Sequence, residues 1–411
     1  MLRASFRRLV ATQFLTVCND NLFKQCVLLL AVATEQRSGN LQPLAQALFS
    51  LPFLLFGAFA GDCADRFPKR SVILATKVAE VAVMLLAAVA FASGSLPFLL
   101  AVVFLMGAQS SFLGPAKYGA LPEHAAPAEL GRANGLFQAT VLAGILLGTG
   151  LAGELKLRLD DRLWVFGLLL AGIATVGWAL ARGMARLPAA DPDRHLRFAP
   201  ARRFVAGLRR AAKVPHLLPA MLGHAVFWMA GSLLLIGWNE LLGVRADGTS
   251  LGVDEGTWSQ ALAGLTLTMA IGALVAGRLA GGSVRRSGLM VGAFGMAAGF
   301  AAMGLVPERP LPLFACAATA SFFSGFYVIP LRTLIQRLPA SHHVGAALGT
   351  SQLLDFTLIF MGSLARPGLA GLGLGTQPMF LALGALMGAS GLLLVRRLPR
   401  AVSLSADAPA R

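Results

Sequence analysis

Residues 61–70 read Gly61-Asp-Cys-Ala-Asp65-Arg66-Phe-Pro-Lys69-Arg70 and separate two apolar runs. Each run is long enough to cross the apolar core of a bilayer. Gly61 is a small residue of the kind that lets membrane helices approach closely, and the Asp65 carboxyl group can accept hydrogen bonds from a neighbouring helix end. The three basic residues that follow form a cluster of the type retained on the cytoplasmic side of a membrane. The stretch is therefore predicted to be a short cytoplasmic loop between two membrane helices.

The loop pattern recurs 216 residues later in a weaker form, Gly277-Arg-Leu-Ala-Gly281-Gly282-Ser-Val-Arg285-Arg286, in which Gly281 replaces Asp65. A second pair of stretches has the same offset to within one residue. Phe112-Leu-Gly-Pro115-Ala-Lys117 corresponds to Tyr327-Val-Ile-Pro330-Leu-Arg332. A chain that repeats at about half its length consists of two copies of one unit. Parallel halves with nested inverted repeats of three helices are a transporter architecture.

The composition is that of a membrane protein. Of 411 residues, 56% are hydrophobic and only 13% are charged, and the mean hydropathy is +0.70. Twelve apolar runs have adequate length for a bilayer core. They lie at 10–34, 42–61, 71–93, 96–116, 132–154, 163–181, 217–240, 257–277, 288–306, 311–331, 344–365 and 377–395. We therefore predict an all-α membrane protein whose twelve transmembrane helices form two pseudo-symmetric six-helix bundles.

The predicted bundles span residues 1–182 and 216–399, with a basic linker at 183–215 and a cytoplasmic tail at 400–411. The linker segment from Arg202 to Lys213 has the character of an amphipathic helix on a membrane surface. The tail is polar, and we expect it to be disordered.

The net charge of +16 is explained by topology. With the N-terminus inside, the cytoplasmic segments hold 26 of the 35 Lys and Arg, the outer loops hold seven, and Lys24 and Lys77 lie in helices. Such asymmetry orients membrane proteins, so both termini are predicted to be cytoplasmic. The basic excess then faces anionic membrane lipid, and no nucleic-acid module or nucleic-acid partner is expected. The four Cys form no close pair, so neither a disulfide framework nor a metal site is expected.

Charged residues inside the predicted helices are candidate functional groups, because an ionisable side chain in a membrane usually faces a cavity or a partner. Asp20 and Lys24 lie four residues apart on one face of the first helix. Two interpretations stay open: Asp20 binds a polar headgroup or a coupling cation in a central cavity, or the two residues neutralise each other and tie the helix to its neighbours. Lys77 and Glu80 are interpreted as a structural pair near the interface, with Lys77 snorkelling.

Several stretches occur together in a known family. They are Asp20-Asn21, the 61–70 loop, Pro115-Ala-Lys-Tyr-Gly119, Ala133-Asn134-Gly135 and Gly325-Phe-Tyr-Val-Ile-Pro330-Leu. The loop resembles the one between helices two and three of the major facilitator superfamily, with Pro68 where that superfamily usually has Gly. The whole set is similar to the bacterial lysophospholipid transporter family of that superfamily, over essentially the entire chain. The Pro-Ala-Lys-Tyr-Gly run is its most specific element.

The resemblance implies a lysophospholipid transporter, not an enzyme, that moves lysophosphatidylethanolamine-like lipids across the bacterial inner membrane for reacylation by alternating access. Together with the intramembrane charges it predicts a substrate site of Asp20, Asn21, Lys24, Lys117, Asn134 and Asp355. It predicts conformational gating by Gly61, Asp65, Arg66, Lys69 and Arg70. The implied partners are the lysophospholipid, membrane lipid and an acyltransferase or acyl-carrier-protein synthetase that acts on the product. No cofactor is expected, and the superfamily fold suggests a monomer.

Some residues depart from the family pattern or have a second interpretation. The seventh helix reads Ser232-Leu-Leu-Leu-Ile-Gly237 where the resemblance predicts a basic residue, and Thr149 replaces a Pro of the superfamily antiporters in the Gly-rich fifth helix. Lys117 either holds a phosphate or is one more cytoplasmic positive charge. His224 is interpreted as a satisfied helix histidine, and Asp355 either binds substrate or packs against another helix.

Two other functions remain as alternatives. One is an efflux transporter for amphipathic drugs in the same superfamily. The other is a membrane acyltransferase, which requires a His followed five positions later by Asp. The candidates do not fit, because His124 is followed at that distance by Glu129 and His342 by Ala347.

Overall fold

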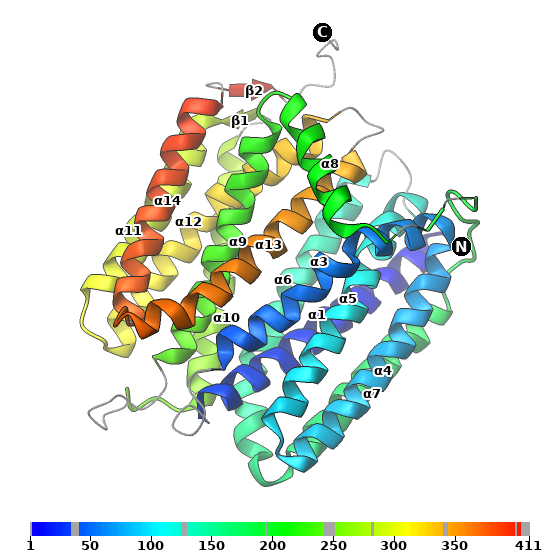
Figure 1. Cartoon of the computed structure of the whole chain (residues 1–411), viewed down its shortest axis with the longest axis horizontal. Coiled ribbons are helices and arrows are strands. Elements are labelled where there is room, and N and C mark those ends of the chain that lie inside the picture. Colours follow the sequence, from blue (N-terminus) through cyan, green and yellow to red (C-terminus); the bar gives the residue numbers. More distant parts are fainter. Residues whose placement is uncertain are drawn as a thin grey trace. The chain divides into compact units, whose positions relative to one another are not determined.

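The computed structural model describes residues 2–33, 41–124, 130–193, 195–196, 198–241, 251–280, 283–339, 344–398 and 401–403. Within these ranges the chain forms thirteen α-helices, one 3-10 turn and two short strands (Figure 1). The first six helices are α1 (Leu2–Ala33), α3 (Gln42–Arg66), α4 (Lys69–Ser93), α5 (Leu96–His124), α6 (Leu130–Arg158) and α7 (Leu163–Arg182). The others are α8 (Pro200–Lys213), α9 (Leu217–Glu240), α10 (Glu255–Ala280), α11 (Arg286–Leu305), α12 (Pro310–Arg337), α13 (Val344–Gly371) and α14 (Thr376–Arg397).

Twelve of these helices coincide with the predicted spans, and α8 is the predicted linker helix. In the described part of the chain, eleven are long and apolar enough to cross a membrane. The exception is α1, whose mean hydropathy is lowered by basic residues at its start and by polar residues such as Asp20 and Lys24. It is nevertheless 32 residues long, about 48 Å at 1.5 Å per residue, and it packs along α6 and α7. The low apolarity of α1 therefore reflects its polar contacts inside the protein.

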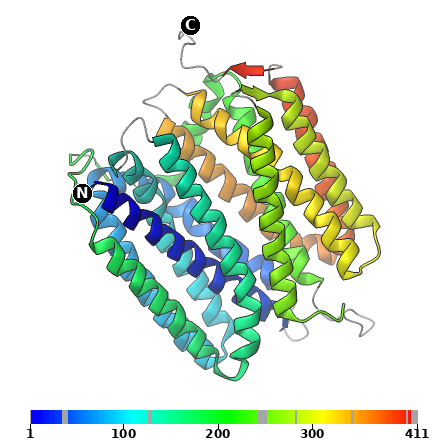
Figure 2. The ribbon, with the colours of Figure 1, turned by 180° about the vertical axis from the view of Figure 1, so that it is seen from behind.

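The chain divides into two compact units. The first unit comprises Met1–Pro200 and Asp254–Ala263, and the second comprises Ala201–Val253 and Gly264–Arg411. Within the first unit, α1 packs on α6, α3 packs on α5, and α4 lies beside α7 (Figures 1 and 2). Within the second unit, α11 lies between α12 and α14, and α9 packs on α13. In both units, sequential helices are thus interleaved with helices distant in the chain.

The core of the first unit contains a row of aromatic rings. Phe91 of α4 meets Phe23 of α1 edge-on at a centroid distance of 6.0 Å, and Phe166 of α7 at 5.8 Å. All three rings are buried. Edge-to-face packing of this kind is favourable for aromatic quadrupoles, and it holds three helices from different parts of the chain together.

Glycines bring several helix backbones into close contact. A side chain at Gly107 of α5 would clash with the Phe49 carbonyl oxygen of α3, and one at Gly148 of α6 would meet the Cys18 carbonyl oxygen of α1 at 2.6 Å. The second contact shows that the Gly-rich fifth span packs closely against α1. The close approach predicted at Gly61 is wrong: no atom of another described helix lies within 4 Å of where its Cβ would be. Helix α3 makes its close approach at Phe49 instead, facing Gly107.

The two short strands differ from the all-helical prediction. β1 (Ser283–Arg285) and β2 (Ala401–Ser403) pair antiparallel, with Val284 opposite Val402. The predicted disorder of the tail is wrong for residues 401–403. The β-branched valines suit a paired strand, in which main-chain groups satisfy each other. Residues 404–411 lie outside the described residues.

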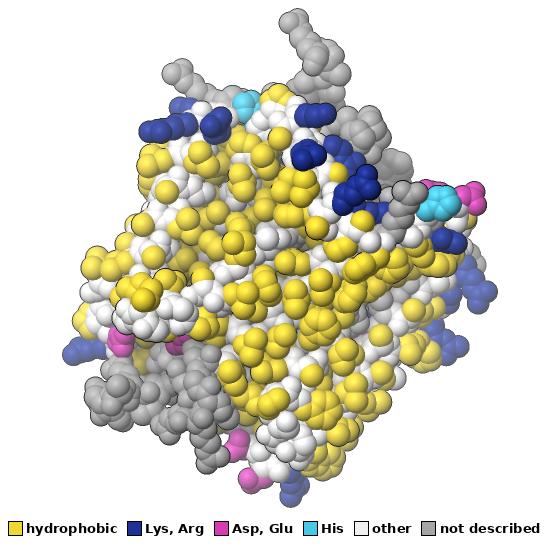
Figure 3. Space-filling model, viewed as in Figure 1, with side chains coloured by type: hydrophobic (Ala, Val, Ile, Leu, Met, Phe, Trp, Pro, Cys, Tyr) yellow, Lys and Arg dark blue, Asp and Glu magenta, His cyan; other side chains and the backbone are white. Residues whose placement is uncertain are grey.

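The surface is that of a protein surrounded by lipid. Apolar side chains cover the visible faces of the long helices, whereas Lys and Arg gather at helix ends (Figure 3). Val89 of α4 is 57% exposed, and Leu274 of α10 is 61% exposed. Large exposed aliphatic side chains over many helices are unfavourable in water and favourable in a bilayer.

Candidate functional site: a polar cluster in the first unit

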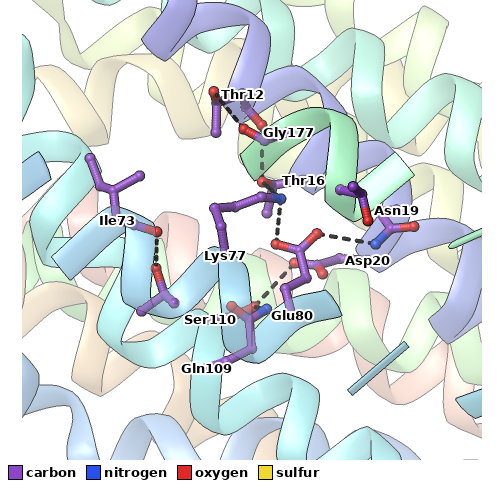
Figure 4. Close-up of polar contacts among 12 residues, drawn as sticks. Thr12, Thr16, Asn19, Asp20, Ile73, Lys77, Glu80, Gln109, Ser110 and Gly177 are labelled. Atoms are coloured by element: carbon purple, nitrogen blue, oxygen red, sulfur yellow. Dashed lines mark hydrogen bonds and ion pairs between the residues drawn. The ribbon is translucent and has the colours of Figure 1, made fainter. Parts of the chain in front are cut away.

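A group of polar side chains lies among the apolar helices of the first unit (Figure 4). We call it the polar cluster. It consists of Thr16, Asn19 and Asp20 from α1, Lys77 and Glu80 from α4, and Gln109 and Ser110 from α5. Polar side chains in such surroundings are costly unless they are paired, so the pairing of each group indicates its role.

The centre of the cluster is a fully buried ion pair. The Lys77 amino group lies 2.6 Å from Oε2 of Glu80, and both side chains are 0% exposed. The Lys77 amino group also donates to the Thr16 hydroxyl at 3.1 Å, and the Asn19 amide donates to the second oxygen of Glu80 at 3.1 Å. These bonds join α4 to α1 and satisfy the pair on both sides, as buried charges require.

The prediction that Lys77 snorkels to the interface is therefore wrong. The physical reason is Gly177 of α7, which leaves room for the lysine stem. A Cβ at this position would lie 2.8 Å from both Cε and Nζ of Lys77. The Thr12 hydroxyl donates to the Gly177 carbonyl oxygen at 3.4 Å and binds α1 to α7 at the same level. The Lys77 side chain is thus buried inside the first unit and does not extend to the membrane interface.

Asp20 occupies the α5 side of the cluster. Its Oδ2 accepts a hydrogen bond from the Ser110 hydroxyl at 3.1 Å, and Ser110 accepts one from the Gln109 amide at 2.8 Å. The other Asp20 oxygen, Oδ1, is buried and has no hydrogen-bond partner among the described residues. A buried acceptor without a donor is unfavourable, so Asp20 has unused capacity to bind a positively charged or hydrogen-bond-donating group.

The two predicted cations near Asp20 make contacts with aromatic rings. The Lys24 amino group lies 5.3 Å from the centroid of Phe49, and that of Lys117 lies 5.6 Å from the centroid of Tyr118. Both charges interact with the Asp20 carboxyl group through space, but no ion pair joins either of them to Asp20 in the described part of the chain. Direct neutralisation of Asp20 by Lys24 is therefore not seen. Both ammonium groups keep donors for a ligand.

Two other predicted substrate residues, Asn21 and Asp355, make hydrogen bonds to residues that do not belong to the cluster. The Asn21 amide donates to the Val17 carbonyl oxygen of its own helix at 2.8 Å. The side chain of Asn134 lies outside the described residues. Asp355 belongs to the second unit, where its Oδ1 lies 2.9 Å from Nδ1 of His224. The Trp228 indole donates to the other His224 nitrogen at 3.4 Å, so a single imidazole tautomer serves both neighbours. The expectation of a satisfied His224 is confirmed.

The predicted loop is shorter than the 61–70 stretch, because α3 continues to Arg66 and α4 begins at Lys69. The predicted gating residues form contacts around this junction, which we continue to call the 61–70 loop. The Lys69 amino group lies 2.5 Å from the Glu123 carboxylate at the end of α5, and Arg70 donates to the Arg182 carbonyl oxygen at the end of α7 at 2.6 Å. The Asp65 carbonyl oxygen accepts from the Asp191 amide at 3.0 Å. The Arg66 guanidinium lies 5.9 Å from the centroid of Phe67. The loop thus connects α3 and α4 to the ends of α5 and α7.

Six of the seven cluster residues are not predicted as site residues from the sequence: Thr16, Asn19, Lys77, Glu80, Gln109 and Ser110. For the last two a signal exists, because Gln109-Ser110-Ser111 is a polar run inside an otherwise apolar span. For Glu80 the signal is a charged residue within an apolar span, but the sequence places it near the membrane interface. Hydropathy places a charge along a helix, but it does not say how deeply the neighbouring helices cover it.

Twelve long helices in two units, with charged side chains enclosed by apolar ones, define a polytopic membrane protein with a transporter fold. Solved structures share this fold: the inward-open xylose transporter XylE from E. coli has a TM-score of 0.73 at 13% identity, covering 97% of each chain. A mutant of the nucleoside transporter NupG has a TM-score of 0.73 at 11% identity, covering 96% of this chain and 100% of its own. At these identities the likeness concerns the fold alone.

Sequence relatives narrow the assignment. The family model of the Major Facilitator Superfamily matches residues 9–246. The lysophospholipid transporter LplT of Klebsiella pneumoniae (strain 342) is 30% identical over 348 residues, 82% of this chain and 81% of the relative. LplT of Enterobacter sp. (strain 638) is 29% identical over 391 residues, 90% and 91% of the two chains. This chain belongs to the Major Facilitator Superfamily and, within it, to the family of bacterial lysophospholipid transporters.

Proposed function

We propose that this protein carries lysophospholipids of the lysophosphatidylethanolamine type across the bacterial inner membrane, where they are reacylated, and that it does so by alternating access without changing them chemically. The names of the similar proteins support the substrate class. The observation that carries the proposal is the unpaired, buried Oδ1 of Asp20 in a polar cluster inside a membrane unit. An intramembrane acid with spare capacity marks a substrate or ion site.

The charges around Asp20 complement such a headgroup. A lysophosphatidylethanolamine headgroup has a negative phosphate and a positive ammonium group. Asp20 accepts hydrogen bonds from the ammonium group, and Lys117 donates charge-assisted hydrogen bonds to the phosphate. Lys24 provides a second cation on the same helix as Asp20. The Lys77–Glu80 pair neutralises itself and positions α1 against α4.

The other roles follow from this proposal. Asp355, oriented by His224, is the polar substrate residue of the second unit. The loop at 61–70 gates transport by breaking and reforming ties such as Lys69–Glu123. Both termini face the cytoplasm. The protein works as a monomer, and an acyltransferase or acyl-carrier-protein synthetase consumes the lipid that it delivers.

The test is uptake of labelled lysophosphatidylethanolamine by cells that lack their own transporter. Wild type, Asp20→Asn and Lys117→Ala are compared at matched membrane levels, with Asp161→Asn as the control because Asp161 is an exposed acid outside the cluster. Removing one partner of a buried charged hydrogen bond costs about 1.5–3 kcal/mol, so we expect uptake to fall by tenfold or more in the two site variants and to stay unchanged in the control.

The outcomes separate substrate from site. If well-folded wild type takes up no lysophospholipid, the substrate assignment is wrong and efflux of amphipathic drugs becomes the leading function. If both site variants keep full uptake, the substrate stands and the proposed headgroup site is wrong.

A further inference from the structure

An apolar groove runs along α5 in the first unit, between α3 and α4. Its volume is about 640 Å³, which lies within the roughly 300–1,000 Å³ that is typical of small-molecule sites. Its walls include Phe67 after α3 and Ala75 and Ala79 of α4, and Leu105 of α5 contributes to its floor. The three helices that bound it are all long and apolar enough to span a membrane. The natural occupant of such a groove is a hydrocarbon chain.

Gln109 is one of the polar residues that line this groove, together with Ser71 and Thr76. It is only 6% exposed, and its amide nitrogen donates to Ser110, which in turn donates to Asp20. Its carbonyl oxygen, Oε1, is buried and accepts no hydrogen bond from the described residues. The last torsion of a glutamine side chain is soft, so the amide can rotate to meet a hydrogen-bond donor that enters the groove. The groove is therefore connected to Asp20 by two hydrogen bonds and carries an unused acceptor.

The combination of one apolar groove and one unused acceptor fits a single-chain lipid. A lysophospholipid has one acyl chain and one free glycerol hydroxyl, which is a hydrogen-bond donor. In a diacyl phospholipid the same oxygen is esterified and donates nothing. A buried acceptor left without its donor discriminates strongly against the ligand that lacks the donor.

We propose that the groove along α5 holds the acyl chain of the transported lysophospholipid, and that Gln109 accepts a hydrogen bond from its free glycerol hydroxyl. Gln109 is then a specificity-determining residue that distinguishes a lysophospholipid from a diacyl phospholipid. The inference rests on the proposed function, because it places the chain and the glycerol of that substrate beside the headgroup site at Asp20.

The hydroxyl contact is tested with a substrate pair. Cells expressing wild type or Gln109→Leu take up labelled lysophosphatidylethanolamine or an analogue in which the free glycerol hydroxyl is replaced by hydrogen. We expect wild type to prefer the natural lipid by about ten- to a hundredfold. Gln109→Leu should transport the two lipids at similar rates, because leucine has no acceptor for the glycerol hydroxyl. Equal uptake of the two lipids by wild type would overturn the assignment of Gln109.

The chain site is tested by filling the groove. Ala79→Trp places an indole in it, whereas Val78→Trp places one on the next residue of α4, which is 55% exposed and does not line the groove. We expect uptake of the natural lipid to fall at least tenfold in the first variant and to stay at the wild-type level in the second. Equal activity of the two variants contradicts the chain site.

A measurement on the unaltered protein covers the case in which Ala79→Trp fails to fold. A lysophosphatidylethanolamine with a photoreactive diazirine at the chain end is irradiated with wild type in membranes, and the labelled residues are mapped. We expect labelling at Leu105 and its groove neighbours, and labelling confined to other helices overturns the site.

Absence of any uptake by wild type contradicts the proposed function itself. Uptake without discrimination or groove labelling contradicts only this inference.

Discussion

At the scale of single residues, the first unit separates two kinds of buried charge. Lys77 and Glu80 satisfy each other and their neighbours completely, with a 2.6 Å ion pair and bonds to Thr16 and Asn19. Asp20 is satisfied on one oxygen only. A fully hydrogen-bonded ion pair has no free donor or acceptor for a ligand. A carboxyl group with one unpaired oxygen still has a free acceptor. This difference is why we assign the headgroup to Asp20 and a structural role to the Lys77–Glu80 pair.

The structural role predicts a specific pattern of stability. Glu80→Gln leaves the Lys77 ammonium group buried without its counter-charge, and breaking a buried pair in this way costs about 3–5 kcal/mol. Replacing both partners, in Lys77→Met with Glu80→Leu, removes the charges together and should restore most of the loss. Thermal unfolding in detergent, followed by size-exclusion chromatography, measures both. If Glu80→Gln is as stable as wild type, the interpretation of Lys77–Glu80 as a closed structural pair is wrong.

At the scale of elements, helix ends are fixed by local hydrogen bonds. Asp254 precedes α10, and its carboxylate accepts both the main-chain amide of Thr257 at 2.8 Å and the Thr257 hydroxyl at 2.7 Å. These two bonds stabilise the ionised form and lower the pKa of Asp254. An acidic residue in this position satisfies a free amide of the first helical turn.

The capping bond makes the start of α10 pH-dependent. Because the pKa of Asp254 is lowered in the folded protein, the stabilisation is fully present above the ordinary aspartate pKa of about 3.9 and is lost as the pH falls through the lowered value. Asp254→Ala should therefore speed amide hydrogen exchange in residues 255–258 severalfold at neutral pH, and the difference from wild type should vanish in strong acid. Asp254→Asn, which keeps an acceptor, serves as the control with no such pH dependence. A difference that persists unchanged in acid contradicts the role of the carboxylate.

At the scale of the whole molecule, the gating proposal requires the contacts between the 61–70 stretch and the ends of α5 and α7 to break and reform during transport. Lys69 is 7% exposed and lies 2.5 Å from Glu123, so the pair joins α4 to the end of α5 in the state described here. Under the gating proposal this tie stabilises one state of the transport cycle against the others.

The gating proposal predicts a charge-swap result. Lys69→Glu places two acids together and should lower lysophospholipid uptake severalfold without loss of the folded protein. Lys69→Glu combined with Glu123→Lys restores opposite charges and should recover most of the uptake. Initial uptake rates at matched membrane levels measure the effect. If the double variant is as impaired as the single one, the pair does not act as a gate.

The sequence alone determined which segments become helices. Apolar runs of bilayer length and the repeat between the 61–70 and 277–286 stretches predicted twelve spans, and each corresponds to a helix of the structure. Span length and hydropathy are local properties, so neighbouring residues suffice to read them. The largest deviations occur at the ends, for example in α5, which continues to His124 beyond the predicted end at 116, because the polar residues of a helix end are not part of an apolar run.

Only the tertiary structure decided which polar groups meet. Ser110 bonds Asp20 across 90 positions, and His224 faces Asp355 across 131. Those partners depend on the rotation of each helix about its axis and on which helices pack together, and such long-range packing leaves no mark in local hydropathy. Gly177 illustrates the point, since its missing side chain makes room for Lys77 from another helix and turns an expected surface lysine into a buried one.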